Sequence, residues 1–260
     1  MKGNTDMNDD NQRLFGRSAL LQAAVELSDE ERYDYTVRQI ARNRAAWLLA
    51  DGDGGGISME LGGKECICIW PEACYAEQFA QGEEGVTPKR MDLDDLLDVL
   101  EEMQSEEETA FAVFPTMKDV YVAPTDTFYE DLCEQAEQEE AGNPHVNPHI
   151  WSAAPQKRYQ NFLHTVCDRG AVWLVRSGDV PLCSEQDLML WPAREDAKEY
   201  LRRQGHAADC TVDYVDVLLF LHMTQAAPNS DVQIFPTEKD AFSMSGKALQ
   251  KASEEELENY

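Results

Sequence analysis

The sequence predicts an α+β fold: two tandem copies of a small domain with helices packed on a mainly antiparallel sheet. Two observations support this prediction. A set of landmarks recurs in one order at a nearly constant offset, and each copy mixes helical with strand-like periodicity. At 260 residues the chain has the length expected of two ordinary domains, and its 43% hydrophobic residues can form a core in each.

The repeat rests on five pairs of landmarks. The first two pairs are 126 residues apart and the last three are 121 apart, so the offset changes once, between Trp47 and Trp70. The glycine-rich run 51–56 lies at that point and is typical of a hairpin tip, where length differences are tolerated. The pairs are Arg32-Tyr33 with Arg158-Tyr159, Trp47 with Trp173, Ile69-Trp70-Pro71 with Leu190-Trp191-Pro192, Asp92 to Leu100 with Asp213 to Leu221, and Phe114-Pro115-Thr116 with Phe235-Pro236-Thr237.

Four segments follow from this repeat. We predict an N-terminal extension over 1–29, the first repeat over 30–140, a linker over 141–156 and the second repeat over 157–260. The linker is predicted from Gly142, Pro144, Pro148 and Pro155, because proline blocks the continuation of a helix.

Within the first copy, apolar spacing predicts helices and strands in turn. Ser28 is expected to cap a helix over 30–44. The predicted elements after it are strands over 46–50 and 65–70, a helix from Pro71 to Ala80, a leucine-rich helix from Asp92, a hairpin formed by 110–114 and 120–122, and an acidic helix from Thr125.

In this order, the landmarks resemble the bacterial domain-of-unknown-function family numbered 2750. The residues that carry the resemblance are Tyr33, Trp47, Ile69-Trp70-Pro71, Asp92 to Leu100 and Phe114-Pro115-Thr116. The second copy matches less fully, because Gly170 and Pro181 interrupt its ribbon region. The resemblance implies a small cytosolic bacterial domain and brings no activity, ligand or catalytic residue.

The formal net charge is −28, which sets the kind of partner to expect. Such a field repels nucleic acids and anionic membranes and favours basic proteins, although a well-solvated surface is an equal alternative. The chain has no apolar run long enough to span a membrane and no signal-peptide core at its start, so we expect a cytoplasmic protein. In that compartment its seven cysteines are reduced: Cys66, Cys68, Cys74, Cys133, Cys167, Cys183 and Cys210.

No motif in the sequence completes a metal or cofactor site. Cys66, Cys68 and Cys74 lie close together but lack a fourth ligand and are better explained as buried small side chains. The run 51–56 lacks the acid that closes a calcium loop and the lysine of a phosphate loop. His145 and His149 are separated by Pro148 in the predicted linker, which disfavours helical ligand spacing. We therefore expect no cofactor and no metal.

Catalytic constellations are absent as well. The repeated pair Asp92 and Asp95 is better explained by capping of the following helix than by acid/base catalysis. His164 is expected to be a structural histidine on its helix, and Trp70 and Trp191 are expected in the core.

The leading hypothesis is a non-catalytic, acidic protein-binding module, for example an immunity-type inhibitor of a basic toxin or nuclease. The alternative is an enzyme or small-molecule binder with a site in the cleft between the two repeats. The candidate binding residues are two repeated loop pairs and four exposed acids: Lys118, Asp119, Lys239, Asp240, Glu83, Glu84, Glu106 and Glu107.

Overall fold

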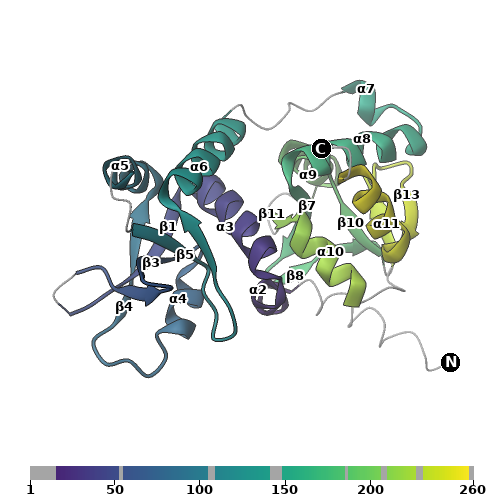
Figure 1. Cartoon of the computed structure of the whole chain (residues 1–260). Coiled ribbons are helices and arrows are strands. Elements are labelled where there is room, and N and C mark those ends of the chain that lie inside the picture. Colours follow the sequence, from purple (N-terminus) through teal and green to yellow (C-terminus); the bar gives the residue numbers. More distant parts are fainter. Residues whose placement is uncertain are drawn as a thin grey trace. The chain divides into compact units, whose positions relative to one another are not determined.

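The computed structural model describes residues 16–52, 55–104, 109–140, 148–184, 187–205, 210–226 and 231–257. The chain divides into two compact units, drawn in Figure 1. The N-unit is Leu27–Gly142, and the C-unit combines Met1–Glu26 with Asn143–Tyr260. Both are α+β. Within the described ranges, no helix has the length and apolar character needed to cross a membrane.

The described part of the N-unit contains a six-stranded sheet in the order β4-β1-β3-β5-β6, with β2 paired to β3. The β3–β5 pair is parallel and the other pairs are antiparallel, as expected of a mainly antiparallel sheet. The strands are β1 (Ala45–Ala50), β2 (Ser58–Leu61), β3 (Lys64–Trp70), β4 (Thr87–Asp92), β5 (Thr109–Val113) and β6 (Tyr121–Pro124).

Three helices cover one face of this sheet: α3 (Asp29–Asn43), α5 (Leu93–Met103) and α6 (Thr125–Glu140). Their apolar side chains meet Ile69, Phe111 and Val113 in one buried cluster. The short helix α4 (Ala73–Phe79) packs against β1, β3 and β4. Because neighbouring residues along a strand point to opposite sides of a sheet, each strand can supply side chains to the helices on both faces.

Helix α3 begins where the sequence predicts. The backbone N–H of Ser28 donates to Glu31 Oε2 at 2.9 Å, and the N–H of Glu31 donates to Ser28 Oγ at 3.3 Å, forming a capping box. One turn after this start, Tyr33 donates from its hydroxyl to Asp131 of α6, and its ring lies 4.5 Å from Tyr121. These contacts fix α3 against α6 and β6.

The C-unit has two described sheets, β11-β7-β8 and β13-β12-β10-β9, which a bridge between Trp173 and Trp191 joins. Read through that bridge, the order β11-β7-β10-β12-β13 corresponds to β4-β1-β3-β5-β6 of the N-unit, and β10–β12 is again parallel. The strands are β7 (Ala171–Ser177), β8 (Val180–Pro181), β9 (Cys183–Ser184), β10 (Asp187–Leu190), β11 (Thr211–Asp216), β12 (Asp231–Ile234) and β13 (Phe242–Ser245).

The helices of the C-unit include one from the start of the chain. Helix α2 (Arg17–Glu26), predicted as part of an extension, packs against α10, and Glu26 lies 3.6 Å from His222. The helices are α2, α7 (Pro148–Trp151), α8 (Pro155–Arg169), α9 (Arg194–Gln204), α10 (Val217–Ala226) and α11 (Gly246–Leu257).

The predicted linker over 141–156 is wrong in its second half. Helix α7 and the start of α8 lie there, and Trp151 is buried. Pro148 and Pro155 begin these helices instead of preventing them. Proline is tolerated in the first turn, where its missing N–H would have no partner within the helix.

The predicted equivalence of Asp92 with Asp213 is also wrong. The N–H of Leu93 donates to Arg44 O at 3.1 Å, and the corresponding bond in the C-unit joins Val217 to Gly170 at 3.0 Å. Asp216 therefore takes the place of Asp92. Aspartates recur every three or four residues in this region of both units, so a sequence alignment of the units can shift by one helical turn. Strand β4, which precedes the helix, was not among the predicted elements.

Candidate functional site

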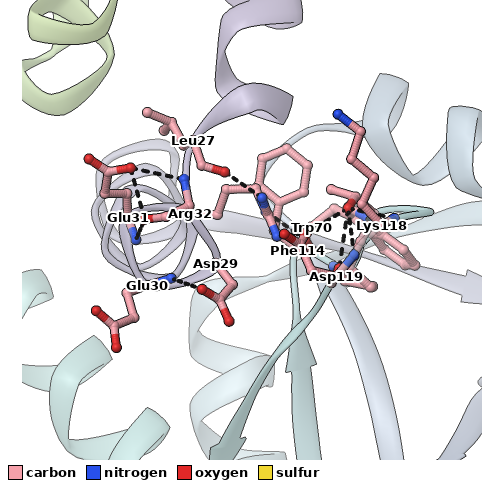
Figure 2. A network of polar contacts seen from close by, with 12 residues as sticks. Leu27, Asp29, Glu30, Glu31, Arg32, Trp70, Phe114, Lys118 and Asp119 are labelled. Carbon is pink, nitrogen blue, oxygen red and sulfur yellow. Dashed lines mark hydrogen bonds and ion pairs between the residues drawn. The ribbon is translucent and has the colours of Figure 1, made fainter.

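The Phe-Pro-Thr turn of the N-unit is anchored by a buried arginine (Figure 2). Arg32, on α3, donates from Nη1 to Leu27 O at 2.5 Å and from Nε to Phe114 O at 3.3 Å. Its Nη2 forms an ion pair with Asp119. Only 2% of the Arg32 side chain is exposed, against 48% of Asp119. The turn is thereby fixed to the first helix of the unit.

The C-unit has the corresponding arrangement. Arg158 donates to Ala153 O at 2.6 Å and to Phe235 O at 3.1 Å, and its Nη2 lies 2.5 Å from Asp240 Oδ1. Phe235 has a positive φ of 46°, as Phe114 has one of 44°. Non-glycine residues rarely adopt this conformation, so both turns need strong anchoring.

Hydrogen bonds within each turn hold the aspartate toward the arginine. Thr116 Oγ1 donates to Asp119 Oδ1 at 2.8 Å, and Thr237 Oγ1 lies 3.2 Å from Asp240 Oδ1. Partial burial raises the pKa of Asp119, but the hydrogen bond from Thr116 and the charge of Arg32 outweigh it and lower that pKa overall. Asp119 is thus held ionised as a structural partner.

The predicted binding residues are therefore not equivalent to one another. Asp119 and Asp240 are engaged by the arginines, whereas Lys118 and Lys239 are exposed, and in Figure 2 the Lys118 side chain extends away from the ion pair. Glu83 and Glu84 are exposed in the loop after α4. Glu106 and Glu107 lie outside the described residues.

Neither the cysteines nor the histidines form a site in the described ranges. Cys66 and Cys68 are buried on β3, and burial raises the pKa of Cys68 to about 12. No group of three or more potential metal ligands occurs among the described residues. His164, predicted as a structural residue, is instead exposed on α8, 3.6 Å from Glu256. His145 is not described.

The paired aspartates behave differently in the two units. Asp92 precedes α5 but makes no capping hydrogen bond and pairs with Arg90. Asp216, in the corresponding place, is buried and accepts from the N–H of Leu218 at 3.0 Å, so the capping prediction holds there. Asp213 lies on β11 and pairs with Arg176 at 2.8 Å. None of these contacts resembles an acid/base pair.

Helices α5 and α6, which pack against each other, carry acidic residues and no basic residue. We call their exposed side the acidic helix pair. The two helices hold twelve acidic residues and no basic residue: Asp94, Asp95, Asp98, Glu101, Glu102, Asp126, Glu130, Asp131, Glu134, Glu137, Glu139 and Glu140. The sequence predicts an acidic last helix, but its packing against α5 depends on the tertiary structure.

The two units differ strongly in charge. Residues 27–142 contain 29 acidic and 8 basic residues, a net charge of −21, whereas the rest of the chain contains 21 and 14, a net charge of −7. In the C-unit, α10 has no Asp, Glu, Lys or Arg, and α11 has three glutamates and two lysines. The acidic helix pair is therefore a property of the N-unit alone.

Arginines neutralise one end of the acidic helix pair. Arg42 binds Glu139 at 2.5 Å, and Arg44 binds Asp94 at 2.6 Å and Glu140 at 2.9 Å. At the middle, Tyr129 of α6 lies within the field of Asp98 and Glu101. The hydrogen bond with Cys133 is the largest cause that raises the pKa of Tyr129, and these two carboxylates add to it. The middle of the pair is thus a strongly negative surface.

Comparisons with known proteins find one family model that matches part of the chain. No curated protein matches the chain. Two solved structures are similar, Anabaena Tic22 (protein transport), at 10% identity over 72% of this chain and 84% of that one, and Tic22 from Plasmodium falciparum, at 8% identity over 71% and 84%. Their TM-scores of 0.25 and 0.27 are too low to support an argument. Residues 33–132, nearly the whole N-unit, match the family described as "Protein of unknown function (DUF2750)".

Proposed function

We propose that this protein is a non-catalytic binding module whose acidic helix pair engages a basic surface on a partner protein. The observation that supports it is the concentration of twelve acidic and no basic residues on α5 and α6. An immunity-type inhibitor of a basic toxin or nuclease, acting in the bacterial cytoplasm, is a concrete form of this proposal. Complementary charge steers such partners together and raises the association rate.

We also propose that the units are two copies of one domain that have diverged in function. The arginine-anchored turns, the positive φ of Phe114 and Phe235 and the strand orders support common descent. The charge difference supports divergence: the N-unit supplies the binding surface. In the C-unit, the helix corresponding to α5 is α10, which has no Asp, Glu, Lys or Arg and packs against α2.

The test compares two full-length variants with the same change in charge. One neutralises the acidic helix pair with Asp95→Asn, Asp98→Asn, Glu130→Gln and Glu134→Gln. The matched control neutralises four exposed acids elsewhere in the N-unit with Glu30→Gln, Glu60→Gln, Glu65→Gln and Glu77→Gln. Partners are captured from lysate of the native host, and the association rate of a captured basic partner is then measured by stopped flow across a salt series.

We expect the helix-pair variant to lose the partner and the control to retain it. The association rate of the wild type should fall steeply as salt rises, because exposed charges are screened beyond about 8 Å at physiological ionic strength. Duplex DNA should not bind. Equal behaviour of the two variants, or a rate independent of salt, would refute the proposal.

A further inference from the structure

A buried carboxylate lies where α7 meets α9 in the C-unit. Asp196, in the first turn of α9, is 8% exposed, and its Oδ1 accepts a hydrogen bond from Nε1 of Trp151 at 2.7 Å. Among the described residues it has no cationic partner, and the charged neighbour that acts on it, Glu195, is itself acidic. Burial without a counter-ion favours the protonated form of a carboxyl group.

Trp151 is the buried residue of α7, which also packs against α8. Its ring meets that of Phe235 edge-on at 5.4 Å, and the guanidinium of Arg203 lies 4.4 Å from its centroid. Arg203 is in turn bound by Glu199 at 2.7 Å and Glu238 at 3.5 Å. A helix of four residues is not stable alone, so the position of α7 depends on these contacts.

The N-unit fills the corresponding place without an ionisable carboxyl group. Tyr75 stands 121 residues before Asp196, the same offset that relates Trp70 to Trp191. Its ring covers Phe114 at a centroid distance of 4.5 Å. In the C-unit, Trp151 from α7 supplies the aromatic cover on Phe235, and Asp196 lies beside it. The C-unit therefore has a carboxyl group at a site where the N-unit has an aromatic ring.

We propose that Asp196 and Trp151 form a proton-dependent clasp: α7 is docked firmly while Asp196 is protonated and is loosened when Asp196 ionises. The other charged groups on strands packed against α9 are engaged elsewhere, Arg176 with Asp213 and Asp216 with the N–H of Leu218. His149, on α7 itself, is exposed. Because α7 is the first described element after α6, its release lengthens the segment that follows α6 by residues 148–152, up to Ala153, whose carbonyl group Arg158 holds.

The direction of the pH dependence follows from the proton affinity of Asp196 in the docked and undocked states. Burial raises the pKa of Asp196 from 3.8 to about 6, with Glu195 adding to the rise and the hydrogen bond from Trp151 opposing it. The docked state then holds the proton more tightly than the undocked state. Docking is strongest at low pH and weakens as pH rises from about 4 through about 6.

Hydrogen exchange at the amides of 150–154 tests the clasp in the full-length protein. After correction for intrinsic rates, α7 of the wild type should open about tenfold more at pH 8 than at pH 5. Asp196→Asn should remove this dependence, because its side chain cannot ionise. Asp168→Asn, which changes an exposed aspartate on α8, should behave like the wild type.

Two results would overturn the clasp: corrected exchange in the wild type that does not change with pH, or an unchanged pH response in Asp196→Asn. If that variant does not fold, the titration of the Asp196 carboxyl carbon, followed by NMR in the wild type, decides the matter. A midpoint near pH 6 supports the clasp, and a midpoint near 4 refutes it. Neither readout depends on the binding partner proposed above.

Discussion

Arg32 and Asp119 are 87 residues apart in the chain and form an ion pair between the first helix of the N-unit and its Phe-Pro-Thr turn. The arginine also donates to two backbone carbonyls, so one buried side chain fixes three segments. Arg158 makes the corresponding contacts in the C-unit. In both units the arrangement anchors a phenylalanine with a positive φ, Phe114 or Phe235, which a non-glycine residue rarely adopts without support.

Loss of that arginine should strongly destabilise the N-unit. We expect Arg32→Met to lower the free energy of unfolding by about 3–5 kcal/mol, because it leaves Asp119 and two carbonyl groups without their donor. Lys118→Ala, at an exposed neighbouring position, should change it by less than about 0.5 kcal/mol. Urea denaturation of both variants measures the difference, and equal effects would contradict the anchoring role.

Acid should weaken the same contact. The folded state lowers the pKa of Asp119, so the folded protein binds this proton less readily than the unfolded chain. The pair therefore stabilises the fold above the usual carboxyl range, and this contribution is lost as pH falls below about 4. Melting temperatures from pH 7 to pH 2.5 should fall more steeply for the wild type than for Asp119→Asn. Parallel curves would contradict a stabilising role for the ion pair between Asp119 and Arg32.

The leucines of α5 differ in how deeply they are buried. Leu100 and Leu96 are fully buried, whereas Leu97, which the spacing alone places in the core, is only partly buried. Leu100→Ala should cost about 2–5 kcal/mol of unfolding free energy, because it removes buried methyl groups and leaves a cavity. Leu97→Ala should cost less than Leu100→Ala. Thermal or chemical denaturation of the pair would show the reverse order if the assigned helix face were wrong.

Metal removal should leave stability unchanged. Burial raises the pKa of Cys66 and Cys68, which disfavours the thiolates that zinc requires, and no ligand group is formed in the described ranges. The melting temperature should be the same with a chelator and with added zinc. Stoichiometric zinc retained through purification, or a melting temperature that falls with chelator, would reverse this conclusion.

The sequence by itself determined what depends on neighbours along the chain. Apolar spacing located most helices and strands of the N-unit, and Ser28 with Glu31 set the start of α3, because capping and periodicity act over a few residues. The core positions of Trp70 and Trp191 and the α+β class could be predicted in the same way. Pro148 and Pro155 show the limit of such local patterns. Proline is tolerated at the start of a helix, where both lie, but not within a helix.

Only the tertiary structure decided which distant residues meet. In the structure, Asp119 and Asp240 form ion pairs with arginines. Asp216, and not Asp213, occupies the position that corresponds to Asp92. Helices α5 and α6 pack together and form one acidic surface. Asp196 is buried beside Trp151, 45 residues away in the chain. These contacts depend on how helices pack over a sheet, and a pairing across 45 to 87 residues leaves no periodic signal in the sequence.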